Sequence, residues 1–238
     1  MKNRTEIDLK LTADQVIVLK LSGSLFFSDE FGRVVKVISD VLRKKPGLKI
    51  AIVAGGGSKA REYIAVAAKA GVDQATLDEI GIMVSRVNAF VLASSLGELS
   101  VTFVPHSLRE VVESMKGNRT VVLGGLHPGQ STNAVGTLVS EKLKAQKFLN
   151  ATDVDGVYTK DPRKFEDAKR LDTVTTHELS RIMSSESMAA GAYDLMDPVA
   201  LKLIERSQIH TWIIKCEAKI IESALLDRKI VGTEIVFN

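Results

Sequence analysis

The chain has 238 residues, of which 45% are hydrophobic and 26% are charged. This composition is ordinary for a folded globular protein and excludes a disordered or fibrous chain. Its 32 basic and 29 acidic residues give a net charge of +3 without a run of five like charges, so the charge favours no nucleic-acid partner.

Cysteine content and hydropathy together indicate the compartment. Cys216 is the only cysteine, which excludes an intrachain disulfide or a metal site built from several cysteines. We expect its thiol to be buried. Residues 1–11 are too charged for a signal peptide, and no stretch approaches about 18 consecutive apolar residues. The sequence therefore predicts a cytoplasmic protein that contacts no membrane.

Short apolar runs alternate with longer segments of helical periodicity along the chain. Helices are predicted at 31–42, 59–69 and 80–96, the last with an apolar stripe that fits either the core or a subunit contact. The alternation predicts an α/β fold, a three-layer α/β/α sandwich with a central, mainly parallel sheet. Strands are predicted at 16–21, 48–54, 101–104, 120–123, 147–151 and 210–214.

The chain reads as a single domain, 1–238, with a soft boundary near 144–147 where a polar helix end meets the next strand. We divide it there into approximate lobes, 1–146 and 147–238. They are not independent domains, because no convincing linker separates them.

Three of the strand-to-helix turns carry glycine: Gly23 in the first, Gly55 to Gly57 in the second, and residues 124–132 in the third. Glycine lets a ligand approach the backbone, and the following helix offers unpaired N–H groups and a positive dipole end. Such turns bind phosphates. In a parallel sheet they gather at the carboxyl edge, so all three are expected to surround one substrate.

The usual nucleotide fingerprints do not occur in the sequence. Without G-x-x-x-x-G-K-[ST] or a G-x-G-x-x-G that opens a βαβ unit, P-loop NTPases and ordinary dinucleotide enzymes are disfavoured. Lys20 and Arg61 instead offer charge to a transferring phosphoryl group. The carboxylates of "TDVDGVYTKDP" suit Mg²⁺ or the orientation of the lysine. The four histidines are scattered without metal-ligand spacing, so no protein metal site is predicted.

Six motifs in a fixed order resemble a known family. They are "VLKLSGS", "VAGGGSKAREYI", "LDEIGIMVSRVNA", "GGLHPGQSTNAV", "TDVDGVYTKDPR" and "AGAYDLMDPVALKLIERS". Together they resemble the amino-acid-kinase superfamily over about residues 16–214, and within it the archaeal type of UMP kinase. The resemblance implies ATP and UMP as substrates, Mg²⁺ with ATP, and a homohexamer arranged as a trimer of dimers.

The resemblance also implies roles for individual residues. Lys20 matches a lysine that stabilises the transferring phosphoryl group, and Arg61 lies where donor and acceptor phosphates meet. Lobe 1–146 would bind UMP and dimerise, and lobe 147–238 would bind ATP. The positions matching UMP contacts are Gly56, Asp78, Leu126, His127, Pro128, Gly129, Gln130, Ser131 and Thr132, with the hydroxyls of the last two reaching the UMP phosphate. The positions on the ATP side are Gly23, Ser24, Gly57, Arg61, Thr152, Asp153, Tyr158 and Asp161.

Several of these residues also have a purely structural interpretation. Lys20 could be a solvated residue at a strand end, and Asp78 could cap the helix that follows it. Tyr158 could be an aromatic side chain that only packs. Asp197 followed by Pro198 predicts a helix start that needs no ligand.

The chain departs from the family pattern at two positions. Many relatives have Asp where this chain has Asn133, and Asn where it has Asp153. The carboxylate that orients the lysine in those relatives is therefore missing at 133, which leaves the role of this position open.

Two alternatives stay open: another kinase of the same superfamily, or a protein that binds a nucleotide without catalysis. Isopentenyl phosphate kinases typically place a His just after the glycine run, where this chain has Ser58 to Arg61. Acetylglutamate and aspartate kinases act on carboxylates, and the latter usually add a regulatory domain. A reading from another class is a catalytically silent oligomer that binds a nucleotide or oxyanion, for which Asn133 is the only hint.

Overall fold

The computed structural model describes residues 15–117, 120–162, 165–184 and 195–237. Its centre is a seven-stranded sheet in the order β3-β2-β1-β4-β8-β9-β7. All neighbours pair in parallel except β8 and β9. The strands are β1 (Gln15–Leu21), β2 (Leu48–Ala54), β3 (Thr120–Leu123), β4 (Lys147–Thr152), β7 (Thr173–Thr175), β8 (Thr211–Lys215) and β9 (Gly232–Val236).

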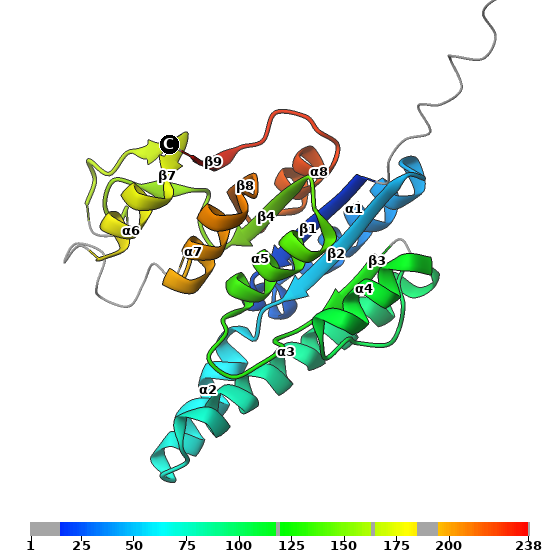
Figure 1. Cartoon of the computed structure of the whole chain (residues 1–238), viewed down its shortest axis with the longest axis horizontal. Coiled ribbons are helices and arrows are strands. Elements are labelled where there is room, and N and C mark those ends of the chain that lie inside the picture. The colour runs from blue at the N-terminus through cyan, green and yellow to red at the C-terminus, as the bar shows by residue number, and fades with distance from the viewer. Residues whose placement is uncertain (1–14, 118–119, 163–164, 185–194, 238) are drawn as a thin grey trace, which may run out of the picture.

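Helices cover both faces of the sheet, as the alternation of strand and helix predicted (Figure 1). Alternate residues of β1 enter two separate cores: Val18 joins the cluster on the α5 face, and Ile17 and Leu19 join the one on the α1 face. The helix layer on the α1 face holds α1 (Glu30–Lys44), α3 (Gln74–Leu96) and α8 (Ala218–Leu225). The helix layer on the α5 face holds α4 (Leu108–Gly117), α5 (Thr132–Leu143), α6 (Thr176–Ser184) and α7 (Pro198–Ser207).

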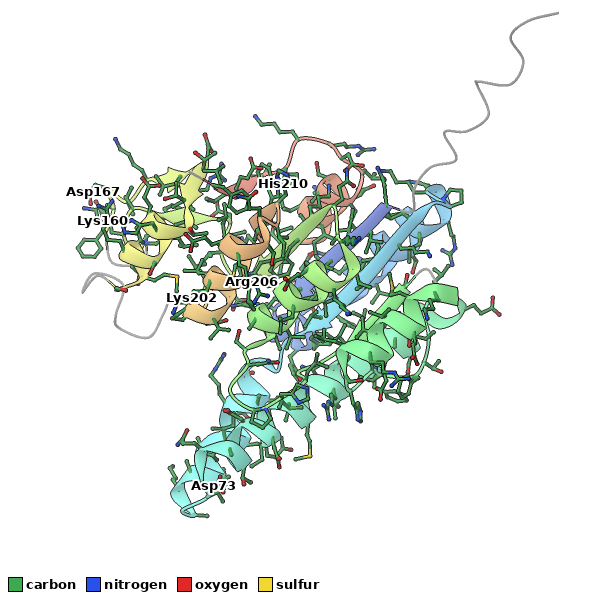
Figure 2. The ribbon with its side chains drawn as sticks, viewed as in Figure 1. Asp73, Lys160, Asp167, Lys202, Arg206 and His210 are labelled. Atoms are coloured by element: carbon green, nitrogen blue, oxygen red, sulfur yellow. The ribbon has the colours of Figure 1, made fainter. Side chains whose placement is uncertain are left out.

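Helix α2 (Gly57–Lys69) packs along α3, and the pair extends beyond the sheet (Figure 1). Asp73 caps α3 at the tip of this pair by accepting a hydrogen bond from the Thr76 N–H at 3.1 Å (Figure 2). The smaller elements are the 3₁₀ turns η1 (Gly23–Phe27) and η2 (Gly97–Leu99) and an antiparallel hairpin of β5 (Val157–Tyr158) and β6 (Arg170–Leu171).

The predicted strand at 101–104 is wrong. Val101 donates one backbone hydrogen bond to the Thr120 carbonyl at 3.3 Å, but Phe103 is exposed and Pro105, which lacks an N–H, follows. The segment is a loop beside the edge strand β3. Helix α3 begins at Gln74, six residues before the predicted start at residue 80. The prediction started too late because the first turns of the helix are mostly polar and show no apolar stripe.

Helix α3 together with η2 is long and apolar enough to cross a membrane by length and composition alone. Core helices of globular proteins can have the same length and composition. Leu92 and Ala93 pack in the core, and Arg86 and Asn88 hydrogen-bond loops at the sheet edge. These contacts favour a core helix.

A buried lysine is paired at the amino ends of the strands, opposite the glycine turns. Lys147 begins β4, is 7% exposed, and donates to the Ala224 carbonyl at 2.6 Å and to the Asp227 carboxylate at 2.7 Å. Lys45 donates to the other oxygen of Asp227 at 2.8 Å. Partial burial alone would raise the pKa of Asp227, but the two lysines outweigh it and hold the pKa below its ordinary value.

We predict that Asp227→Asn destabilises the protein by about 1–3 kcal/mol at neutral pH, because it removes the countercharge of a buried ammonium. Urea denaturation measures the loss. Since the folded pKa of Asp227 is lowered, its contribution is present above its unfolded pKa and is lost as the pH falls through the folded value. The difference in the free energy of unfolding between wild type and Asp227→Asn should therefore become smaller at acid pH.

Asp40→Asn is the matched control, because its partner Lys36 lies on the exposed face of α1. We expect this change to stay within about 0.5 kcal/mol. Equal losses in the two variants would contradict a special role for the buried pair.

Candidate active site

The first two glycine turns touch each other through their backbones. A Cβ atom on Gly23 would lie 2.1 Å from the Gly57 nitrogen, and one on Gly55 would lie 2.8 Å from the Gly23 nitrogen. Gly57 also has φ +67°, which favours glycine. Only residues without side chains fit this approach. The turns after β1 and β2 therefore meet at one point of the carboxyl edge, as expected for parallel strands.

The third turn is held by polar side chains of α3. The Gly125 N–H donates to the Ser85 hydroxyl at 2.7 Å, and Arg86 donates to the carbonyls of Gly125 and Leu126 at 3.1 and 3.2 Å. Asn88, one turn further along, donates to the Gly55 carbonyl of the second turn at 2.8 Å. One helix thus positions two of the three glycine turns.

Asp78 reaches the same turn from the beginning of α3. Its carboxylate accepts a hydrogen bond from the Gly129 N–H at 2.7 Å. Gly129 has φ +77° and lies within the turn that the Gln130 N–H closes by donating to the His127 carbonyl at 3.3 Å. Asp73 is the cap of this helix, so the interpretation of Asp78 as a cap is wrong.

Ser131 and Thr132 differ in the structure. The Ser131 hydroxyl is the N-cap of α5: it accepts from the N–H groups of Asn133 and Ala134 at 3.0 and 3.1 Å and hydrogen-bonds Asp197. Thr132 is the first residue of the helix and is half-buried. Because the Ser131 hydroxyl is engaged by capping, Thr132 is the better candidate for a contact with phosphate.

Asp197 starts α7, as predicted, by accepting from the Ala200 N–H at 2.9 Å ahead of Pro198. Its second oxygen takes the bond from Ser131, so it also ties α7 to the start of α5. Further along the same two helices, Arg206 of α7 forms an ion pair with Glu141 of α5 at 2.6 Å. Arg206 and Lys202 of α7 are labelled in Figure 2.

Lys20 and Arg61 approach the turns in different ways. Lys20 lies on β1, level with Val53 of β2 and Asn150 of β4, and is 8% exposed, so the interpretation as a solvated strand end is wrong. Arg61 lies one turn into α2 and is exposed. Among the described residues it makes no hydrogen bond or ion pair. Its guanidinium is therefore available to an anion.

The loop after β4 joins the first turn. The Ser24 hydroxyl donates to the Asp153 carboxylate at 2.5 Å, and the Asp153 N–H donates to the Thr152 hydroxyl at 2.6 Å. The Ser22 N–H also donates to the Ala151 carbonyl at 2.9 Å. These contacts bring together two segments that were both assigned to ATP.

Tyr158 and Asp161 lie further along the same loop. The Tyr158 hydroxyl donates to Asp155 at 2.9 Å, and burial followed by this bond raises the pKa of Tyr158. Arg170 donates to the same carboxylate at 3.3 Å. Tyr158 is also partly buried against the core, so packing accounts for part of its role. Asp161 is 2% exposed.

Cys216 follows β8 and is partly buried. Burial raises the pKa of its thiol to about 12, so the sulfur is protonated at neutral pH and is a poor nucleophile.

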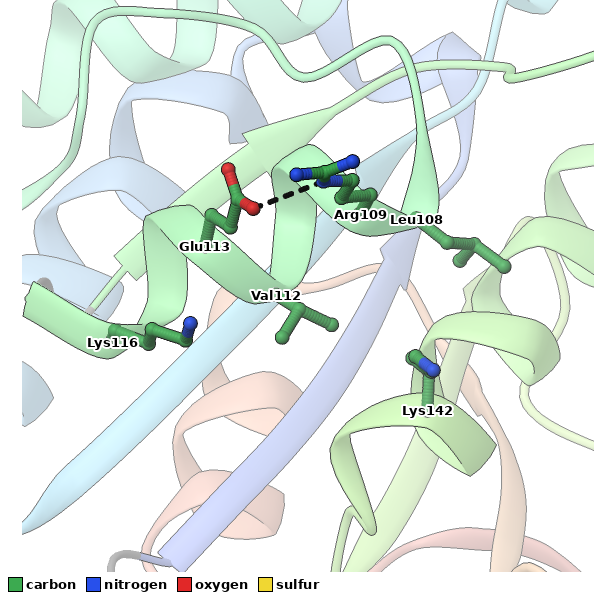
Figure 3. Close-up of a pocket in the computed structure, with 6 residues that line it drawn as sticks. All are labelled: Leu108, Arg109, Val112, Glu113, Lys116 and Lys142. Carbon is green, nitrogen blue, oxygen red and sulfur yellow. Dashed lines mark hydrogen bonds and ion pairs between the residues drawn. The ribbon is translucent and has the colours of Figure 1, made fainter.

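A separate pocket of about 470 Å³ lies between α4 and α5 (Figure 3). Within it Arg109 donates to Glu113 at 3.1 Å along α4. None of its lining residues belongs to the glycine turns. They are Leu108, Arg109, Val112, Glu113, Lys116 and Lys142.

Sequence reasoning missed four residues that shape the site: Ser85, Arg86, Asn88 and Asn150. Ser85 and Asn88 are both buried on α3 among apolar residues. Buried polar side chains three residues apart on an apolar stripe are the signal that could have identified them, because such groups need hydrogen-bond partners.

Residues 15–215 match the Amino acid kinase family. A uridylate kinase from Sulfurisphaera tokodaii is 44% identical over 197 residues, which are 81% of this chain and 86% of that protein. The crystal structure of uridylate kinase from Archaeoglobus fulgidus has a TM-score of 0.82 and 36% identity, and the match covers 92% of this chain and 99% of that one.

UMP kinase from Bacillus anthracis shares the fold, with a TM-score of 0.75 at 20% identity over 93% of this chain and 96% of that one. The matched span and the sandwich with its glycine turns define the class of protein: the chain belongs to the amino acid kinase family. Within that family it is a relative of the archaeal uridylate kinases.

We predict that Ser85→Ala costs about 1–3 kcal/mol in the free energy of unfolding, because the buried Gly125 N–H loses its acceptor. Urea denaturation at neutral pH measures it. Ser95→Ala is the matched control on the same helix, since this exposed hydroxyl donates to the Val91 carbonyl four residues back and, among the described residues, holds no loop. A loss at Ser85 no larger than that at Ser95 would mean that the hydroxyl does not hold the third turn.

Proposed function

We propose that the chain transfers the γ-phosphoryl group of ATP to UMP, giving ADP and UDP. One observation carries the proposal: three glycine turns converge at one sheet edge, where Lys20 is the penultimate residue of β1 and Arg61 lacks a partner among the described residues. Backbone N–H groups and cations that are fixed before substrate binds stabilise the charge of a transferring phosphoryl group without reorganisation.

The hydrogen bonds between loops divide the site into one half for UMP and one half for ATP. The third turn, which α3 holds through Ser85, Arg86 and Asp78, binds the UMP nucleotide, with its phosphate at the Thr132 end of α5. Gly56 and the segment 126–131 complete this half. The loops of Ser24 and Asp153 bind ATP, with Thr152, Tyr158 and Asp161 on the adenosine side. Lobes 1–146 and 147–238 are then functional halves of one continuous sheet.

Lys20 and Arg61 act between the halves. Lys20 offers its ammonium to the transferring group, where negative charge is greatest in the transition state. Arg61 bridges phosphate oxygens of the two nucleotides through its planar fork of donors. Gly23 and Gly57 keep side chains away from the phosphates.

Mg²⁺ accompanies ATP in this proposal. The described residues hold no group of three or more His, Cys, Asp or Glu that could bind a metal alone. Mg²⁺ commonly binds substrate phosphates with one or two carboxylates, and the exposed Asp153 beside Ser24 fits that donor set. When bound there, the ion would neutralise charge on the ATP phosphates.

A coupled ADP-release assay with UMP, CMP, isopentenyl phosphate and N-acetylglutamate tests the proposal. We expect turnover with UMP to exceed that with each alternative. Preference for isopentenyl phosphate or N-acetylglutamate would select another kinase of the family, and no turnover with any acceptor would select a silent binding protein. A cytoplasmic location is part of the proposal, since free UMP and ATP are soluble substrates.

We predict that Arg61→Ala lowers kcat/KM for UMP about a hundredfold with the fold intact, because a bidentate contact to phosphate is lost. Steady-state kinetics and circular dichroism measure the two effects. Lys69→Ala, at the exposed far end of the same helix, should stay within about threefold. An Arg61 variant within the same limit would remove Arg61 from the site.

We also propose that the outer face of α2 and α3 pairs with the same face of a second copy, as the first step towards a hexamer. Met83, Val87 and Phe90 are 56%, 62% and 55% exposed at helical spacing on α3, and α2 adds Tyr63 and Val66 at 61% and 70%. Exposed apolar side chains that gather on two packed helices in this way typically mark a protein interface. A two-fold axis would let this face cover itself.

We predict that Val87→Glu lowers the molar mass measured by light scattering after gel filtration at micromolar concentration, because it places a charge within the apolar face. Val199→Glu is the control, since Val199 is similarly exposed, at 47%, but lies on α7. An unchanged mass for Val87→Glu would exclude this face as an interface.

A further inference from the structure

The last residue of β8 brings an ammonium group to the carboxyl edge of the sheet. Lys215 ends β8 and pairs with Thr152, the last residue of β4, in the register of these two parallel strands. The Cys216 N–H, one residue later, donates to the Thr152 carbonyl at 2.8 Å. Lys215 therefore ends beside a segment that we place in the ATP half of the site, although no motif in the sequence singled it out.

Lys215 extends towards the α5 face of the sheet and is close to the side chains of the loop after β4. Ile213, two positions earlier on β8, joins the core cluster on the α5 face, and side chains alternate along a strand. Glu217, mainly through its hydrogen bond, raises the pKa of Lys215, and the charges of Asp155 and Tyr158 raise it further. These two side chains are thus within electrostatic reach of the ammonium.

The ion pair that Lys215 makes is exposed to solvent. Its Nζ lies 2.7 Å from Oε1 of Glu217, and the two side chains are 45% and 44% exposed. Exposed pairs contribute little, because water screens the charges and two long side chains must be ordered. A phosphate group offers stronger, charge-assisted hydrogen bonds to the same ammonium. Glu217 therefore holds a cation that an anionic ligand can take over.

The position of Lys215 indicates which part of ATP it meets. Asp153, directly after Thr152, accepts a hydrogen bond from Ser24 in the first glycine turn, where we place the ATP phosphates. Asp155, two residues further, accepts one from Tyr158 on the adenosine side at 2.9 Å. Lys215 lies beside the start of this loop and within reach of both ends. The α-phosphate is the group that joins the triphosphate to the nucleoside.

We propose that Lys215 is a further ATP-binding residue, whose ammonium leaves Glu217 and donates to the α-phosphate of ATP. The α-phosphate is not transferred, so this contact is equally strong in the ground state and in the transition state. It therefore serves affinity for ATP and leaves the rate of transfer unchanged. The inference rests on the proposed function, of which it completes the ATP half.

Isothermal titration calorimetry with single nucleotides and Mg²⁺ tests this role. Lys215→Met keeps the stem and deletes the charge, so Kd for ATP should rise about tenfold. Kd for ADP should rise by the same factor, because ADP carries the same α-phosphate, and Kd for UMP should change less than about twofold. Unchanged binding of ATP would overturn the proposal. So would a loss that affects ATP but not ADP, since it would put the ammonium at the γ-phosphate.

Lys36→Met is the matched control, because it removes another exposed lysine that is paired with a carboxylate. Lys36 contacts Asp40 at 2.6 Å along α1. Both variants lose one positive charge, so any long-range effect of net charge on nucleotide binding is common to them. Lys36→Met should keep Kd for ATP within about twofold of wild type. An equal loss of ATP affinity in the two variants would show a general charge effect and overturn the proposal.

Steady-state kinetics separate binding from chemistry. Lys215→Met should raise KM for ATP about tenfold and keep kcat and KM for UMP within about twofold. A fall in kcat with an unchanged KM for ATP would overturn the proposal. Turnover of UMP by the wild type is measured first and decides the proposed function on its own, because calorimetry reports ATP binding whichever acceptor is used. A wild type that does not bind ATP would overturn both.

Discussion

Gly23 and Gly57 meet through their backbones, and the carboxyl edge of the sheet is organised around that contact. The 2.1 Å between a Cβ on Gly23 and the Gly57 nitrogen leaves no room for any side chain. The ends of β1 and β2 are thereby fixed relative to each other. Ser24 follows directly and reaches the loop after β4 through Asp153 at 2.5 Å. Three neighbouring strands therefore end in one connected structure, and Lys20 belongs to the central one of them.

Side chains that cross-link the loops are mostly neutral or already engaged. Ser85 and Asn88 hold two of the glycine turns without adding charge. The Asp78 and Asp153 carboxylates each accept a hydrogen bond from another loop. Arg86 is also engaged, through the carbonyls of Gly125 and Leu126, whereas the exposed Arg61 makes no hydrogen bond or ion pair among the described residues.

Most of the sheet could be predicted because its strands are continuous apolar runs, as buried parallel strands are. The run at 48–54 is one of them, and β2 has these bounds. In the final third β8 was predicted, but β7 and β9 are short or half polar and gave no comparable signal. The turns themselves could be placed from glycine alone. The contacts of Ser85 and Asn88 could not, because they depend on which distant backbone groups the fold brings to them. The roles assigned from family resemblance to Lys20, Arg61 and the nucleotide loops stay predictions.

Helix α3 carries two sets of contacts that must stay in phase. Asp78, Ser85, Arg86 and Asn88 contact the loops from one side, while Met83, Val87 and Phe90 form an apolar stripe on another. Each residue turns an α-helix by about 100°. Insertion or deletion of a single residue between Asp78 and Asn88 would therefore rotate one set away from its partners. The length of this segment is therefore a fixed dimension of the fold.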